Sequence, residues 1–416
     1  MGQESLVETA TRVIDSGEGD FPLPVGTMGQ IERIAEDVYF LPIFSNVIVL
    51  DSGDGLVLVD SGPMRMGGQV VAALRQISGD PVSAVIYTHG HVDHVFGVEA
   101  IEESQGSPVT VYAHEAVPRR FERYKLTAGY NTCINRRQFG FSDMHWPEEY
   151  RFPDVTYASR YSLEVGSLAL ELNHAKGETD DHTWVWVADK GLVCTGDLII
   201  WCTPNAGNPQ KVQRYPKEWA EALRQMAALE AEVLLPGHGL PVVGAARVAR
   251  VLSDTAELLE HIVSQTLELM NQGLPLDEIL ARVRFPESLI QKPYLRPIYD
   301  DPEFIVRNVW RLYGGWYDGN PAHLKPPRFD EIADEIASMV GGARVLAERA
   351  RSAADRGDLR LAAYLAELAG RVAGGDSEVA STRKQIFELL AEKEPSLMAK
   401  NIYREAARLA APDKAP

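Results

Sequence analysis

The chain has 416 residues, 45% hydrophobic and 24% charged, which is the composition of a globular protein with room for two or three domains. Its 59 acidic residues outnumber its 41 lysines and arginines, and the net charge of −18 argues against binding to nucleic acid or anionic lipid. No stretch approaches the roughly 20 apolar residues of a membrane span, and the N-terminus lacks the basic and apolar segments of a signal peptide. We therefore expect a cytoplasmic protein that binds neither nucleic acid nor membrane.

The first half of the chain alternates between predicted strands and helices. Residues 1–25 are polar and rich in glycine, and we expect them to be loosely attached. Short apolar runs and turn signals then predict strands at 38–41, 46–50, 56–60 and 82–87 and helices at 68–78 and 95–103. This alternation is typical of an α/β domain.

The segment after the strand at 82–87 has the strongest chemical signal in the chain. It reads His-x-His-x-Asp-His and places three of the ten histidines within six positions, which argues against chance. Imidazole and carboxylate are ligands of zinc and similar divalent ions. His89 and His91 point the same way and can share an ion, whereas Asp93 and His94 are displaced and can hold a second ion about 3.5–4 Å away.

Residues 115–160 interrupt the alternation with several arginines interspersed with aromatic side chains. A long insertion after a metal-binding loop commonly forms part of a cleft wall, because binding residues concentrate in loops. A surface elaboration with solvated charges is an equally good interpretation. The sequence leaves both interpretations open.

The second half begins with strands and ends in helices. Strands are predicted at 167–172, 184–187, 192–194 and 233–235, and helices at 248–272, 276–283 and 305–313. The block at 329–410 is almost wholly helical, with alanine-rich text around Gly357-Asp358 that is typical of a tetratricopeptide-like hairpin. Such a block either caps the first domain or offers a partner surface, and we favour a dimer surface.

Three later turns carry further candidate metal ligands: the segment His174–His182, Asp197 and His238. Each follows a predicted strand or lies between two, so all three can converge on one edge of the sheets. Taken singly, a Gly-Asp or Gly-His turn is more often a backbone device than a ligand. Because these turns follow the histidine loop in this order and at this spacing, we interpret them as sources of metal ligands.

These segments together resemble the metallo-β-lactamase superfamily over about residues 28–245. The resemblance rests on Asp60, the 89–94 loop, the turn at Glu178, Asp197 and His238. It implies an α/β fold, an αββα sandwich, followed here by an all-α, tetratricopeptide-like helical domain. The superfamily usually has His where Glu178 stands, and a glutamate there resembles the alkylsulfatase branch.

Two further segments are similar to that branch: the run Tyr313–Leu324 and the C-terminal helical block, which is similar to its dimerisation domain. We therefore predict a catalytic domain at 28–245, a helical connection and cleft wall at 246–325, and a dimerisation-like domain at 326–410. A homodimer is the expected assembly.

The resemblance also implies a ligand set for two divalent ions. His89, His91 and Glu178 would hold one ion, Asp93, His94 and His238 the other, and Asp197 would bridge them. The bridging position needs a carboxylate, because a neutral imidazole cannot span two cations. We expect Zn²⁺, with Mn²⁺ or Fe²⁺ also admitted because Glu178 makes the first site harder. Supporting positions beside the ligands are predicted for Asp60, His174 and His182.

The implied activity is a dinuclear metal-dependent hydrolase in which a metal-bridged hydroxide attacks a sulfate ester or a related small-molecule ester. Asp93 and Asp197 are the predicted catalytic residues, with Asp93 handling the proton. An anionic substrate with an apolar part would be contacted by Lys211, Arg214, Asn205 and Asn208, although these are equally interpretable as a solvated loop.

The chain departs from the alkylsulfatase pattern in two places. The loop after Asp197 lacks an Arg-Gly-rich segment, and Glu303-Phe304-Ile305 stands where those enzymes tend to have a His-Asn pair. Three alternatives therefore stay open: a lactonase, esterase or phosphoesterase on the same scaffold, an iron-dependent enzyme that uses oxygen, and a scaffold protein with a vestigial metal site.

Overall fold

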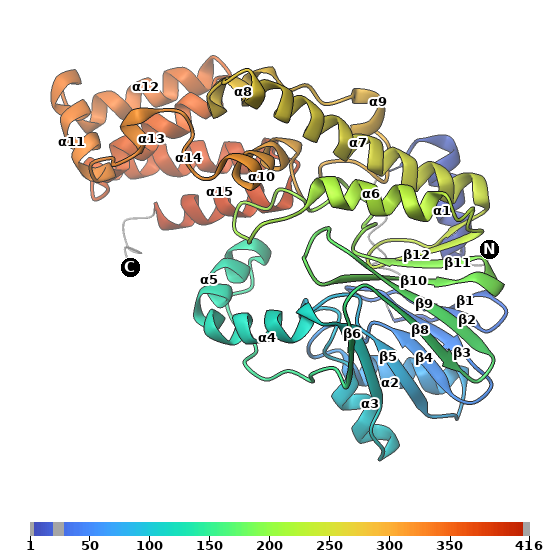
Figure 1. Ribbon diagram of the computed structural model, residues 1–416. Helices are drawn as coiled ribbons and strands as arrows, with labels where there is room; N and C mark the ends of the chain where they lie inside the picture. Colours follow the sequence, from blue (N-terminus) through green and yellow to red (C-terminus); the bar gives the residue numbers. More distant parts are fainter. Residues whose placement is uncertain (1–3, 20–28, 411–416) are drawn as a thin grey trace. The chain divides into compact units, whose positions relative to one another are not determined.

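The computed structural model describes residues 4–19 and 29–410, and the chain forms two compact units (Figure 1). The first unit contains the described residues up to Gly129 together with His145–Leu274 and Glu278–Gly315. The second contains Tyr130–Met144, Pro275–Asp277 and the described residues from Trp316 onward. No helix in these described ranges has the length and apolar character needed to cross a membrane.

Two β-sheets form the centre of the first unit (Figure 1). Within the described residues, one sheet has seven strands in sequence order: β1 (Glu32–Ala35), β2 (Val38–Leu41), β3 (Val47–Asp51), β4 (Leu56–Val59), β5 (Val82–Ile86), β6 (Thr110–His114) and β7 (Val155–Tyr157). The other sheet has the order β13-β12-β11-β10-β9-β8, with bounds β8 (Arg160–Val165), β9 (Leu168–Ala175), β10 (His182–Val187), β11 (Leu192–Gly196), β12 (Val233–Pro236) and β13 (Val242–Val243).

The inner strands of the first sheet are apolar throughout because both of their faces are buried. Side chains alternate across a strand, so Ile48 and Leu50 of β3 belong to the core that the two sheets share. Their neighbours Val47 and Val49 belong to a second core on the other face of this sheet. A continuous apolar run is therefore what this position in the fold requires.

Helices cover the outer faces of both sheets (Figure 1). The first sheet is covered by α2 (Gly67–Ile77) and α3 (Val98–Gln105), and the second by α6 (Pro216–Ala227) and α7 (Ala245–Asn271). Three further helices follow α7 along the chain: α8 (Leu276–Arg282), α9 (Glu287–Ile290) and α10 (Pro302–Gly314). The layers confirm the predicted αββα sandwich.

The expectation of a loosely attached N-terminal segment is wrong for residues 6–16. They form helix α1 (Leu6–Ser16), which begins with a capping box between Ser5 and Glu8. Leu6, Val13 and Ile14 are buried in the core shared by the sheets. The apolar residues fall on one face of the helix, a pattern that the surrounding polar residues conceal in the sequence. Residues 1–3 and 20–25 lie outside the described ranges.

The insertion at 115–160 contains two helices, α4 (Ala116–Leu126) and α5 (Ala128–Phe139). Its charges are not uniformly solvated. The Arg120 side chain is 3% exposed and pairs with Asp180 and Asp181, whereas the neighbouring Arg119 side chain is 75% exposed. The interpretation of the insertion as a purely solvated elaboration is therefore wrong at Arg120.

The second unit is built from helices, as predicted: α11 (Phe329–Val340), α12 (Ala343–Asp355), α13 (Leu359–Ala373), α14 (Ser377–Lys393) and α15 (Leu397–Leu409). Its core is rich in alanine, including Ala347 and Ala369, so the helices approach closely. Asp358 begins α13 by accepting a hydrogen bond from Leu361 N. The segment Tyr130–Met144 belongs to this unit, since Asn401 Nδ2 donates to Gln138 O at 2.6 Å.

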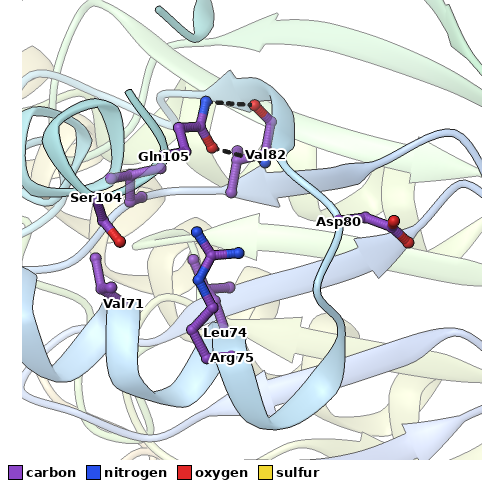
Figure 2. A pocket seen from close by; sticks show the side chains of 8 residues that line it. Val71, Leu74, Arg75, Asp80, Val82, Ser104 and Gln105 are labelled. Atoms are coloured by element: carbon purple, nitrogen blue, oxygen red, sulfur yellow. Dashed lines mark hydrogen bonds between the residues drawn. The ribbon is translucent and has the colours of Figure 1, made fainter. Parts of the chain in front are cut away.

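A hollow between α2, α3 and the start of β5 holds none of the predicted site residues (Figure 2). Gln105 donates to Val82 O at 3.2 Å and accepts from Val82 N at 3.0 Å, so it joins the end of α3 to the first residue of β5. The apolar part of the lining comes from Val71, Leu74 and Ile101. We interpret this hollow as a packing feature.

Candidate metal centre

The predicted ligands lie just beyond strand ends in the first unit. The loop 88–94 follows β5, Glu178 follows β9, Asp197 follows β11, and His238 follows β12. Because β11 and β12 are parallel, their carboxyl ends lie at the same edge of the second sheet. The architecture thus gathers chemically reactive side chains on turns that rigid strands support.

One group of candidate ligand atoms comes from His89, His91, Glu178 and Asp197, and all lie within 4.8 Å of one another. The Nε2 atom of His89 is 2.8 Å from His91 Nδ1 and 3.7 Å from Asp197 Oδ2. The Nδ1 atom of His91 is 3.8 Å from Glu178 Oε2. His89, Glu178 and Asp197 are buried and His91 is half-buried, so the group is largely shielded from water.

A second group comes from Asp93, His94 and His238, again within 4.8 Å of one another. Asp93 Oδ2 is 3.6 Å from His94 Nε2 and 3.4 Å from His238 Nε2. Asp93 and His238 are half-buried, so this group is open to solvent on one side.

Asp197 lies between the two groups. Its Oδ2 atom is 3.7 Å from His89 Nε2, while its Oδ1 atom is 3.3 Å from His94 Nε2 and 3.4 Å from His238 Nε2. A Cβ atom at Gly237 would lie 2.2 Å from Asp197 Oδ1, so only glycine fits at this position beside the carboxylate. The two carboxylate oxygens therefore face different groups.

Hydrogen bonds on the far side of the imidazole rings fix their orientation. His94 Nδ1 donates to Asp60 Oδ2 at 2.7 Å, and His238 Nδ1 donates to Phe44 O at 2.6 Å. Thr88 donates to both oxygens of Asp60, from its backbone N at 2.7 Å and its Oγ1 at 2.8 Å. Such bonds leave the opposite ring nitrogen with a lone pair for a metal ion. Nothing in the local sequence marks Thr88 for this role except its place at the strand end.

The charges of the cluster fit a cation. Burial raises the pKa of Glu178, and the nearby Asp197 raises it further, against the opposing effect of Arg214. Burial acts to lower the pKa of His94, but the surrounding carboxylates outweigh it and raise that pKa. The buried atoms His94 Nε2 and Asp197 Oδ1 have no hydrogen-bond partner among the described residues. Crowded carboxylates and unpaired lone pairs of this kind are what a divalent ion satisfies.

Two of the predicted substrate contacts, Asn205 and Arg214, lie against Glu178. Asn205 Nδ2 donates to Glu178 Oε1, and Arg214 Nη1 donates to the Glu178 carbonyl and lies 3.1 Å from its Oε1 atom. Asn208 is buried, and its Oδ1 accepts from Gln210 N at 3.0 Å. Asn205 and Arg214 thus join the loop after Asp197 to Glu178, and the Asn208 hydrogen bond lies within that loop.

Lys211 is half-buried, with its Nζ atom 5.4 Å from the centre of the Trp146 ring. Burial lowers the pKa of this ammonium to about 7, and the charge of Arg214 contributes in the same direction, whereas Glu178 and Asp93 oppose it. These influences indicate that Lys211 lies in the electrostatic field of the metal centre.

His174 and His182 belong to neither group of candidate ligand atoms. His174 stacks on His114, with ring centres 3.6 Å apart, and its Nδ1 donates to His182 O at 3.0 Å. The His182 ring stacks on His89 at 4.9 Å, and its Nε2 donates to Thr195 O at 3.0 Å. His182 thus packs directly behind His89, while His174 is one contact further away.

Two family models match this chain, and together they identify its class. One, described as "Metallo-beta-lactamase superfamily", matches residues 41–238, so this part of the chain is similar to that superfamily. The other, described as "Alkyl sulfatase dimerisation", matches residues 275–411. The chain therefore combines a metallo-β-lactamase match with an alkylsulfatase-type dimerisation match, which confirms the resemblance seen in the sequence.

Curated relatives agree with this assignment. A linear primary-alkylsulfatase from Pseudomonas sp. (strain ATCC 19151) is 27% identical over 86% of this chain and 72% of its own length. An (R)-specific secondary-alkylsulfatase from Pseudomonas sp. is 25% identical, and the match covers 87% of this chain but 59% of that relative. The solved structure of the stereoselective inverting sec-alkylsulfatase Pisa1 from Pseudomonas sp. has the same fold, with a TM-score of 0.81, 24% identity and coverage of 92% of this chain and 66% of that one.

Proposed function

We propose that this protein is a dinuclear metal-dependent hydrolase of alkyl sulfate esters. The single observation that carries the proposal is Asp197, whose two carboxylate oxygens face two separate groups of ligand atoms. The similarity to alkylsulfatases supports sulfate esters as the substrate class. We propose Zn²⁺ as the metal, because histidine nitrogens and carboxylate oxygens suit it.

Two bound divalent ions would supply water with a pKa near 7 and a positive field for charge that develops on the ester oxygens. The chain would supply the positions of the groups around them. We propose that Asp93, which is half-buried and lies within 3.6 Å of both His94 and His238, accepts the proton released as water attacks. Arg214 and Asn205 would keep Glu178 in place, and the charge of Arg214 opposes the rise in its pKa.

Lys211 is the proposed contact for the sulfate group, and Asn208 a further one. An ammonium held partly out of water binds an anion more strongly than a solvated one, because fewer water contacts compete. Apolar surface for an alkyl chain would come from Phe44, which is 48% exposed beside His238, and from Val212, which is 43% exposed beside Lys211. These residues would accommodate both the negative head and the apolar tail of an alkyl sulfate.

Rates on esters that share one alkyl chain test the proposal. The purified, zinc-loaded protein should hydrolyse alkyl sulfates faster than the matching phosphates and carboxylic esters, with two zinc ions per chain by elemental analysis. A protein that holds two zinc ions, leaves sulfates intact and cleaves another ester would contradict the sulfatase assignment but keep the hydrolase assignment. One iron per chain with oxygen consumption would contradict both.

A further inference from the structure

A buried ion pair supports the backbone between two of the candidate ligands. Asp181 lies in the turn after β9, three residues beyond Glu178, and its side chain is fully buried. Its Oδ2 atom accepts from Gly90 N at 3.1 Å and from Arg120 Nε at 2.8 Å. Arg120, on α4, has a side chain only 3% exposed and also pairs with Asp180.

Gly90 is held on more than one side. Its N–H is bound by Asp181, and a Cβ atom at this position would lie 2.9 Å from Arg120 Cδ and 3.1 Å from Asp181 Oδ2. Gly90 joins His89 to His91, so a rotation of its backbone would turn both imidazoles. The ion pair therefore limits the movement of the segment that carries both histidines.

Stability alone does not explain such a pair. Removing two charges from water carries a large free-energy cost, and well-packed apolar residues often replace a buried pair without loss of stability. The second group of ligand atoms has different supports, since His94 is bound to Asp60 and His238 to the Phe44 carbonyl. If the ion pair orients metal ligands, it should therefore affect only the first group of ligand atoms.

We propose that Arg120 and Asp181 are positioning residues that act through Gly90 to set His89 and His91 for one divalent cation. The proposal rests on the proposed metal centre but not on the choice of substrate. Loss of the pair should weaken binding of the ion at His89, His91 and Glu178 and leave the ion at Asp93, His94 and His238 unchanged. Loss of a hydrogen bond that orients metal ligands typically costs about 10–100-fold in metal affinity.

The test measures metal binding in the metal-free full chain by titration with Zn²⁺ and with Co²⁺, whose absorption reports its ligands. Arg120→Met, Arg120→Lys and Asp181→Asn should each lose about 10–100-fold in affinity for one of two ions. In a His238→Ala background, where the first site is retained, Arg120→Met should weaken the remaining ion. In a His91→Ala background it should have no effect.

Arg151→Met is the matched control, because Arg151 is a 23% exposed arginine of the same unit that pairs with Glu102 and Asp154. This variant should bind both ions as tightly as the wild type. Its melting temperature should fall by about as much as that of Arg120→Met. Equal losses at both sites, or unchanged affinities in all three Arg120 and Asp181 variants, would overturn the proposal. Arg120→Lys keeps the charge and Asp181→Asn keeps the shape of the side chain, so these two variants test the proposal if Arg120→Met does not fold.

The metal-binding result is separate from the substrate assignment. A wild-type chain that binds two ions without cleaving sulfates contradicts only the substrate assignment, whereas one that binds no ion overturns the positioning role as well.

Discussion

Lys211 connects the chemistry of a single residue to the charge of the proposed substrate. Its ammonium is half-buried beside Trp146, and burial together with Arg214 lowers its pKa to about 7. A lysine with a lowered pKa is charged below that pKa and neutral above it. Substrate binding at this position should therefore depend on pH in the neutral range, where an ordinary lysine would not titrate.

We expect the KM of the wild-type enzyme for an alkyl sulfate to rise as the pH increases through about 7, because the anion loses a charged partner. Lys211→Met should give a high KM at every pH, and Lys211→Arg a low KM throughout, because the guanidinium stays protonated. Steady-state kinetics from pH 6 to 9 at constant ionic strength would measure this. A wild-type KM that follows Lys211→Met across the range would show that this ammonium does not contact the substrate.

For single residues, the sequence indicates which side chains can bind metal more readily than it indicates which residues contact one another. Asp197 and His238 are recognisable because few side chains bind metal and each follows a strand, whereas Glu178 is singled out by the family resemblance. Arg214 and Asn205 were predicted as substrate contacts because they are polar residues in a loop near the site. Their hydrogen bonds to Glu178 span 36 and 27 residues, and no local pattern encodes such a contact.

Among the elements, α1 shows how a polar sequence conceals a core helix. The segment 6–16 contains acidic, basic and small residues, but its apolar side chains recur on one helical face. That face packs into the same core as β3 and β9. The helix is therefore a structural part of the sandwich rather than an attachment to it.

Ile14→Ala should lower the free energy of unfolding by about 2–4 kcal/mol, because it leaves a cavity in a packed core. The control Arg12→Ala removes an exposed ion pair with Glu4 and should cost less than about 1 kcal/mol. Urea denaturation followed by circular dichroism would measure both. Equal and small effects would show that α1 does not contribute to the core.

The strands and the long helices were predictable because their periodicity is local. The strands at 38–41 and 56–60 and the helix at 248–272 lie within a few residues of β2, β4 and α7. Short elements at sheet edges, such as β1 and β13, carry too few residues for a periodic signal. The helices α4 and α5 were missed for another reason: their apolar faces are interrupted by arginines.

At the scale of the whole molecule, the helical unit is the part expected to join two copies of the chain. Its match to a dimerisation model supports an oligomer, and we propose a homodimer. Several large apolar side chains on α11 and α13, which pack together, are exposed to solvent: Met339, Val340, Leu361 and Tyr364. Large apolar side chains that stay exposed to solvent are candidates for contact with a second copy of the chain.

Light scattering should give twice the chain mass of 45.9 kDa for the wild type and the chain mass for a Met339→Glu, Tyr364→Glu double variant. The charges would be buried without partners in the interface, which is costly. Leu126→Glu, at an exposed position of α4, is the control and should stay dimeric. A double variant that remains dimeric would place the interface on another surface of the chain.

The sequence by itself determined the class of protein and the inventory of the metal centre. The His-x-His-x-Asp-His loop, Glu178, Asp197 and His238 are recognisable because metal coordination allows few residue types and the strand ends fix their order. Only the tertiary structure decided which atoms face which group, that Arg214 lies on Glu178, and that Arg120 and Asp181 support Gly90. Those contacts join residues up to 91 positions apart, so they depend on how the sheets and helices pack and not on any local sequence pattern.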